Sequence, residues 1–120
     1  MKIAISCTEK SPETDVDSRF GRAPFFAVYN TETQEFEFID NQQTLNSPSG
    51  AGVQAAQHIV NAGVSALLTG HCGPKAFKAM NAAKIKIYTN ISGAVKDAIA
   101  AFEKGELTEA AEADMEGHWI

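Results

Sequence analysis

The sequence has few cysteines with which to form disulfides, and it has no long apolar segment of the kind that exported or membrane-spanning chains need. Its 120 residues include two cysteines, Cys7 and Cys72, and one tryptophan. No stretch approaches the roughly 20 consecutive apolar residues of a membrane span, and the N-terminal segment lacks the apolar core of a signal peptide. Without an export signal, two cysteines predict free thiols in a reducing compartment. We therefore expect a cytoplasmic protein that has no membrane partner.

Basic residues are also scarce. The chain has ten lysines and arginines and 15 aspartates and glutamates, so its formal net charge is −5. A general nucleic-acid binder needs a basic surface, so nucleic acid is not an expected partner. The two arginines of the chain, Arg19 and Arg22, lie three residues apart. They form either a local anion site on an acidic protein or a pair of solvated surface side chains.

Length and composition predict one globular domain. Hydrophobic residues make up 44% of the chain and charged residues 21%, which is ordinary for a soluble domain. We expect a single α/β domain over residues 1–105 and an acidic, flexible tail over residues 106–120, where the apolar pattern fades. The pattern predicts strands at 2–7, 25–30, 35–40, 65–69 and 84–88, and helices at about 51–62, 74–83 and 93–105.

The strand patterns also predict a topology. Residues 2–7 and 65–69 are continuously apolar, which is typical of strands covered on both faces. Residues 35–40 and 84–88 alternate, which is typical of edge strands. Together they predict a five-stranded mixed sheet in the order 3-2-1-4-5 with strand 2 antiparallel, the arrangement of three-layer ribonuclease-H-like folds. The order reverses between strands 1 and 4, where open α/β sheets bind ligands outside the strands' carboxyl ends.

Two details of the helices follow from residue spacing. In the helix at 51–62, the apolar positions predict a buried face made of Val53, Ala56, Ile59 and Val60. Ser92 stands where a side chain can cap the last helix. The segment 8–24 is polar and contains two prolines and a glycine, which predicts a long loop of the kind that often carries function.

Three segments leave the carboxyl edge at the expected reversal point. They are residues 7–8, 70–75 and 89–93, and the last two lead into helices. Helix starts offer unpaired N–H groups and the positive end of the helix dipole to an anion. The residues predicted to hold an anionic ligand are therefore Arg19, Phe20, Gly21, Arg22, Gly70, Gly73, Lys75, Ser92 and Gly93.

Three side chains near this edge are soft or borderline metal ligands, namely Cys7, His71 and Cys72. Cys7 ends a buried strand, so it is either a small hydrophobic residue or a ligand. Cys72 lies at a helix start, where the pKa of a thiol is lowered, so it is either a ligand or a packing residue. His71 either bonds the loop or binds metal.

No catalytic set is present. The sequence has no Ser-His-Asp set, no phosphate-binding loop ending in Gly-Lys-Ser/Thr, and no Cys-x-x-Cys. Ribonuclease-H chemistry needs clustered carboxylates that bind metal, and the first strand carries Ser6 and Cys7 at that place. We therefore expect a binding protein and not an enzyme.

Three motifs in this order identify a family. The segments 17–26 (DSRFGRAPFF), 50–52 (GAG) and 70–77 (GHCGPKAF) resemble the dinitrogenase iron–molybdenum cofactor biosynthesis family over residues 1–105. The resemblance implies a ribonuclease-H-like fold and the carriage of iron–molybdenum cofactor precursors or, in orange-protein-like members, of molybdenum-containing sulfide clusters. It also implies cluster donor and acceptor proteins as partners, with a P-loop ATPase of the Mrp type among them.

Two functions stay open at this point. Many relatives have histidine directly before Phe-Gly, where this chain has Arg19, and this favours electrostatic holding of an anionic cluster containing iron, molybdenum or both. The first function is a small carrier or scaffold for such a metal–sulfur cluster. The second is a sensor or adaptor domain that binds a small anionic metabolite without metal. In either case we expect a monomer or a weak dimer.

Overall fold

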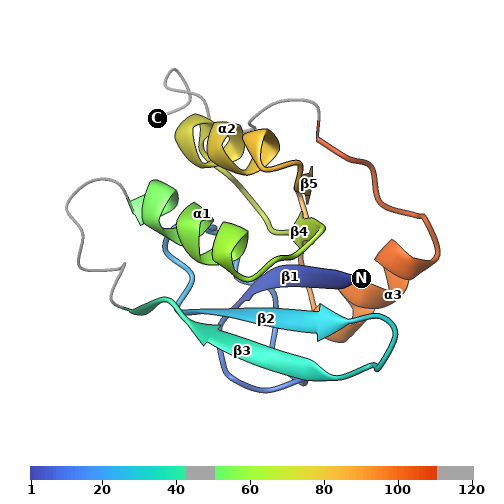
Figure 1. The fold of residues 1–120 in the computed structure, drawn as a ribbon. Coiled ribbons are helices and arrows are strands. Elements are labelled where there is room, and N and C mark those ends of the chain that lie inside the picture. Colours follow the sequence, from blue (N-terminus) through green and yellow to red (C-terminus); the bar gives the residue numbers. More distant parts are fainter. Residues whose placement is uncertain (43–50, 111–120) are drawn as a thin grey trace.

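The fold is one five-stranded sheet with helices on both faces (Figure 1). We describe it from a computed structural model, which covers residues 1–42 and 51–110. The strand order is β3-β2-β1-β4-β5, as the sequence predicted. The strands are β1 (Lys2–Cys7), β2 (Phe25–Asn30), β3 (Phe36–Asp40), β4 (Ala66–Leu68) and β5 (Lys86–Tyr88), and the helices are α1 (Ala51–Asn61), α2 (Pro74–Ala82) and α3 (Val95–Glu103).

The pairing of the strands brings three carboxyl ends to one edge. β1 pairs in parallel with β4, and β4 pairs in parallel with β5. β2 runs antiparallel to both β1 and β3, with Cys7 opposite Phe25. The segments that follow β1, β4 and β5 therefore leave the sheet together, on the side where an α/β sheet binds its ligands.

The two faces of the sheet carry separate cores. α1 and α2 pack on one face through Ala55, Ala56, Ile59, Ala76, Phe77 and Met80. α3 packs on the other face through Val95, Ala98 and Ile99. Successive residues of β1 alternate between the two, because side chains of a strand point to opposite faces: Ala4 belongs to the α1–α2 core, and Ile3 and Ile5 belong to the α3 core.

The buried face of α1 differs from the predicted one at Val53, which is 43% exposed. The helix instead buries Ala51, Ala55, Ala56 and Ile59. A Cβ atom on Gly52 would lie 3.5 Å from the Cβ of Ala76 in α2, so α1 approaches α2 closely on a face of small residues. Close packing of small side chains has outweighed the greater hydrophobicity of valine.

The start of α3 also differs from the expectation that Ser92 caps it. The N-cap residue is Ala94, which makes no side-chain cap hydrogen bond. The N–H of Val95 instead donates to the carbonyl oxygen of Thr14, at 3.0 Å. The loop that follows β1 therefore satisfies this helix start, and no side chain of the helix itself is needed.

The packed chain continues past the boundary predicted at residue 105. Glu109 forms an antiparallel bridge with Tyr88 of β5, and the N–H of Ala110 donates to the carbonyl oxygen of Ile87 at 2.8 Å. Leu107 packs against the α3 core. Residues 111–120, where the flexible tail was predicted, lie outside the described residues.

The loop over residues 8–24 is attached to the sheet at several points. The N–H of Asp17 donates to the carbonyl oxygen of Ser6 at 2.9 Å, and the N–H of Val16 donates to that of Gly93 at 2.8 Å. Four of its side chains are buried: Thr14, Asp17, Phe20 and Ala23. In the described part of the chain, no helix is long and apolar enough to cross a membrane.

This loop also bonds the segment that follows β4. The N–H of His71 donates to the carbonyl oxygen of Ser18 at 2.7 Å, and the N–H of Phe20 donates to the carbonyl oxygen of His71 at 3.1 Å. A Cβ atom on Gly70 would lie only 2.5 Å from Cα and 2.6 Å from the carbonyl oxygen of Ser18. Glycine is therefore required at position 70 for the two backbones to meet.

Side chains of the central strands are buried, so shortening one of them should lower the stability of the protein. Leu67 is fully buried in the α1–α2 core, so we expect Leu67→Ala to lower the free energy of unfolding by about 2–5 kcal/mol. Val53→Ala serves as the control, because Val53 is 43% exposed on α1, and it should change stability by less than about 0.5 kcal/mol. Urea unfolding followed by circular dichroism measures both, and equal losses would contradict this assignment of the core.

The close approach at Gly70 predicts a second stability effect. Because the added methyl group would press against the backbone of Ser18, Gly70→Ala should cost about 1–3 kcal/mol. It should also raise the hydrogen-exchange rate of the His71 amide. At Gly73, whose φ is −72°, a Cβ atom would meet nothing within 4 Å. Gly73→Ala should therefore change stability by less than about 1 kcal/mol, and a similar loss in both variants would refute the steric explanation.

Candidate functional site

A pocket lies where the loop after β1 meets the start of α2. Its volume is about 330 Å³, which is within the range of small-ligand sites. Both arginines of the chain are among its lining residues, so the sequence-predicted cationic patch and the predicted helix start form one site. The lining residues are Arg19, Phe20, Gly21, Arg22, His71, Gly73 and Pro74.

A buried carboxylate holds Arg19 in place. Asp17 is 5% exposed, and its Oδ1 accepts hydrogen bonds from the backbone N–H and the Nε–H of Arg19 at 2.9 and 3.2 Å. Its Oδ2 accepts from the Nη2–H of Arg19 at 3.2 Å. The hydrogen bond and the charge of Asp17 raise the pKa of Arg19 above its usual value, so this guanidinium group stays charged and oriented.

Asp17 also reduces the positive charge of the site. Its carboxylate pairs with the guanidinium group of Arg19, so Arg19 adds less positive charge to the site than an unpaired arginine would. Asp17 belongs to the sequence motif at residues 17–26, but it was not among the residues predicted to form the site. The available signal was an aspartate two residues before an arginine, a spacing at which a carboxylate can bond the following backbone N–H.

The start of α2 presents backbone donors beside the arginines. Gly73 is the N-cap residue and makes no side-chain cap hydrogen bond, and Pro74 stands in the first turn. The N–H of Phe77 already donates to Gly73 at 2.9 Å. Proline has no N–H, so Lys75 and Ala76 carry the first-turn N–H groups that lack an acceptor within the helix. This end of a helix attracts anions.

The structure brings six of the predicted site residues to this pocket and leaves the other six outside its lining. Phe20 is 2% exposed, and its ring packs against Phe26 with centroids 5.3 Å apart, so its main contact is with the core. Gly93 has a φ of +86° and accepts the N–H of Val16, which is a structural role. The residues outside the lining are Cys7, Gly70, Cys72, Lys75, Ser92 and Gly93.

The two cysteines lie in different cores. Cys7 belongs to the α3 core and Cys72 to the α1–α2 core, so the sheet separates them. Burial raises the pKa of the Cys7 thiol to about 11. Cys72 is 1% exposed, and its Sγ lies 3.7 Å from the carbonyl oxygen of Gly73. Metal binding needs a thiolate, so the burial of both thiols favours packing roles.

Of the three predicted metal ligands, His71 is the one that lines the pocket. Its side chain is exposed. Over residues 1–42 and 51–110, no group of three or more His, Cys, Asp and Glu side chains is arranged to hold a metal ion. The donor set fits an anion that accepts hydrogen bonds from guanidinium and backbone N–H groups better than a metal ion that needs several protein ligands.

Solved structures with the same architecture cover nearly the whole chain. The apo form of the orange protein from Desulfovibrio gigas is 37% identical, has a TM-score of 0.93, and is matched over 95% of this chain and 96% of its own. A protein of Thermotoga that is provisionally assigned as NifB is 34% identical, has a TM-score of 0.83, and is matched over 97% and 98% of the two chains.

An archaeal sequence and a family description agree with these structures. An uncharacterized protein of Methanocaldococcus jannaschii is 29% identical over 110 residues, which is 89% of each chain. Residues 1–105 match the family described as dinitrogenase iron-molybdenum cofactor, which is the range over which the sequence motifs resembled it. This chain therefore belongs to the dinitrogenase iron–molybdenum cofactor family.

Proposed function

We propose that this chain is a small carrier or scaffold whose cargo is an anionic metal–sulfur cluster held in the pocket beside α2. The observation that supports this most is the backbone clamp between Ser18, Phe20 and His71. The clamp sets the arginine loop against the start of α2, so that Arg19, Arg22 and the residues Gly73 and Pro74 at the helix start border one 330 Å³ pocket. Membership of the iron–molybdenum cofactor family supports the same cargo.

The donors of the pocket suit such a cargo. A guanidinium group has five N–H donors, and Asp17 uses two of those on the Arg19 side chain. The remaining donors of Arg19 face solvent or ligand, because its side chain is 64% exposed. Charge-assisted hydrogen bonds can hold a polyanion without a full set of metal ligands. A cluster held in this way can be released to an acceptor without breaking several protein–metal bonds.

The proposal is a carrier and not an enzyme, and it is supported by a pocket lining in which His71 is the one base and no carboxylate is included. His71 borders the pocket and is the side chain best placed to add one direct bond to a cluster metal. The expected partners are cluster donor and acceptor proteins, with a P-loop ATPase of the Mrp type among them, in the cytoplasm. The ribonuclease-H-like classification of the fold likewise stays a prediction.

A second candidate is a sensor or adaptor domain that binds a small phosphate or carboxylate metabolite without metal. The specific observation in its favour is the pairing of Arg19 with Asp17, which leaves the pocket with a modest positive charge. Arginine beside a helix start is a common arrangement for binding one phosphate group. This candidate uses the same pocket, so the ligand taken up by the protein decides between the two.

The arginines should control uptake of the cargo. We expect the anaerobic wild-type protein to bind tetrathiomolybdate and to shift its visible absorption band. Arg19→Ala combined with Arg22→Ala should weaken binding about tenfold or more at low salt, because charge-assisted hydrogen bonds are lost. The difference should narrow in about 1 M salt, where the screening length falls to about 3 Å. Spectroscopic titration at both salt concentrations measures this.

The matched control removes the same charge elsewhere. Lys86 on β5 and Lys104 after α3 are exposed and outside the pocket lining, so their double alanine variant should bind almost as well as wild type. Equal weakening in both double variants would show that only net charge matters. Binding of inorganic phosphate at Arg19 and His71, without uptake of tetrathiomolybdate, would replace the carrier by the adaptor.

The buried thiol and the exposed imidazole should behave differently. Cys72 is buried in the α1–α2 core, so we expect Cys72→Ala to leave the absorption band of the bound cluster unchanged while lowering stability. His71 lines the pocket, so His71→Ala should weaken uptake or shift the band. Anaerobic absorption spectra of the two variants give the comparison, and a band that moves with Cys72→Ala alone would assign the thiol as a metal ligand.

A further inference from the structure

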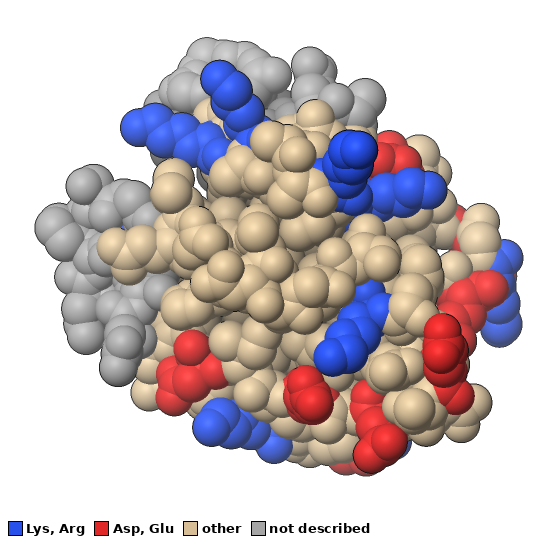
Figure 2. All heavy atoms as spheres, viewed as in Figure 1, with Lys and Arg blue, Asp and Glu red and all other residues tan. Residues whose placement is uncertain are grey.

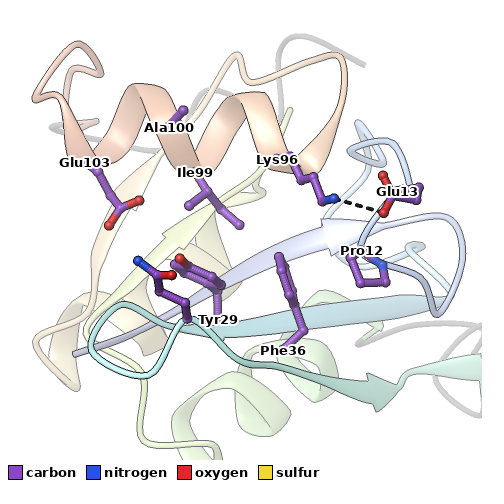
Figure 3. Close-up of a pocket in the computed structure, with 9 residues that line it drawn as sticks. Pro12, Glu13, Tyr29, Phe36, Lys96, Ile99, Ala100 and Glu103 are labelled. Atoms are coloured by element: carbon purple, nitrogen blue, oxygen red, sulfur yellow. Dashed lines mark hydrogen bonds and ion pairs between the residues drawn. The ribbon is translucent and has the colours of Figure 1, made fainter.

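A second pocket lies on the opposite face of the sheet, between α3 and the β2–β3 hairpin (Figure 3). Its volume is about 470 Å³, within the range of small-molecule sites. It shares no lining residue with the pocket beside α2. Its lining comes from the loop after β1, from the hairpin and from α3, and consists of Pro12, Glu13, Tyr29, Gln34, Phe36, Lys96, Ile99, Ala100 and Glu103.

The floor of this pocket is aromatic. Tyr29 and Phe36 are cross-strand partners whose ring centroids lie 4.9 Å apart. Ile99 and Ala100 of α3 lie above them (Figure 3). Phe36 is half-buried and stacks on Phe38 with centroids 6.2 Å apart. Apolar surfaces above and below suit the ring or alkyl chain of a small molecule.

The charged side chains around this floor differ in whether they have an ion-pair partner. Lys96 donates to Glu13 at 2.9 Å, so these two charges neutralise each other. Glu103 is the last residue of α3, and its carboxylate points from the helix toward the floor (Figure 3). Within the described part of the chain, no hydrogen bond or ion pair joins this carboxylate to another residue. The carbonyl end of the helix dipole adds negative potential at the same place.

The hairpin beside the pocket increases that negative potential. Residues 23–74 contain no lysine or arginine. Glu32 of the hairpin pairs with the N-terminal ammonium group at 3.3 Å, and the hairpin also carries Glu35, Glu37 and Asp40. Figure 2 shows acidic side chains along the part of the surface where the hairpin lies, and basic side chains mostly over the part where α2 lies. A field of this sign raises the local concentration of cations and lowers that of anions.

We propose that the groove between α3 and the β2–β3 hairpin binds a small organic cation with an aromatic or alkyl body, such as an arylalkylamine. The body lies on the rings of Tyr29 and Phe36, and the ammonium group lies toward Glu103. The aromatic faces attract the cation electrostatically, and the carboxylate accepts its N–H donors. This groove and the pocket beside α2 then take ligands of opposite charge on opposite faces of the sheet.

The experiment titrates the ¹⁵N-labelled full chain, free of metal, with tryptamine and with indole-3-propionate, a probe of similar size and opposite charge. We expect saturable amide shifts at Tyr29, Phe36 and residues 96–103 with tryptamine. Tryptamine should bind at least about fivefold more tightly than the acid. Only the amides of this groove are used to fit the affinities, so any binding of the acid at the pocket beside α2 is measured separately and the result is independent of the proposed cargo.

Variants connect the binding to the named groups. Glu103→Gln should weaken tryptamine binding about three- to fivefold. Glu106→Gln removes the same charge three residues further on and outside the lining, so it should change binding by less than about 1.5-fold.

Three results would each overturn this inference. The first is an absence of saturable shifts at these amides up to tryptamine concentrations on the order of 10 mM. The second is equal affinity for tryptamine and indole-3-propionate. The third is equal weakening by Glu103→Gln and Glu106→Gln, since that would assign the effect to overall charge and not to the groove.

Discussion

A buried hydroxyl network at the carboxyl edge of β1 and β4 determines the position of the arginine loop. The Oγ–H of Ser6 donates to the carbonyl oxygen of Asp17 at 2.7 Å, and Ser6 Oγ lies 2.8 Å from Thr69 Oγ1. A hydroxyl has one proton to donate, so Thr69 is the donor to Ser6. Both hydroxyls are fully buried, and leaving one unpaired would cost about 1–3 kcal/mol. The backbone of Asp17 is therefore held against both central strands.

From this attachment the geometry of the site follows in order. The N–H of Asp17 donates back to Ser6, which turns the Asp17 side chain beneath the next residues. Its carboxylate then accepts three hydrogen bonds from Arg19. Two residues later the chain passes Gly21, where an added Cβ would lie 2.9 Å from the backbone nitrogen of Gly52 in α1. The loop is thus fitted between β1, β4 and α1.

The sequence predicted the parts of this arrangement that depend on local pattern. Continuous apolar residues in β1 and alternating ones in β3 were enough for the strand order, because burial on two faces or on one leaves a distinct periodicity. The clustering of Arg19 and Arg22 in one loop, with a helix start after β4, was enough to place the pocket. These features can be predicted without knowing which side chains from distant parts of the sequence are in contact.

The remaining parts depend on contacts that a single sequence does not contain. From its place at a helix start Cys72 could be either a metal ligand or a packing residue, and the structure buries it, at 1% exposed, in the α1–α2 core. Val53 has the hydrophobicity of a core residue, but the close approach of α1 to α2 favours alanines at the interface. The aromatic floor at Tyr29 and Phe36 depends on the register of β2 with β3, which neither strand specifies alone.

The division of charge between the two faces has a physical cause in the same loop. Residues 12 and 13 border the α3 groove, and residues 19–22 border the pocket beside α2. Between them, Asp15 pairs with Ala94 and Val16 bonds Gly93, so the loop is fixed to the start of α3 before it reaches the arginines. On one side of this attachment Glu13 pairs with Lys96, and on the other side Arg19 pairs with Asp17. Glu13 and Arg19 thus each pair with a different residue on their own side of this attachment, and the charged groups of the two pockets stay separate.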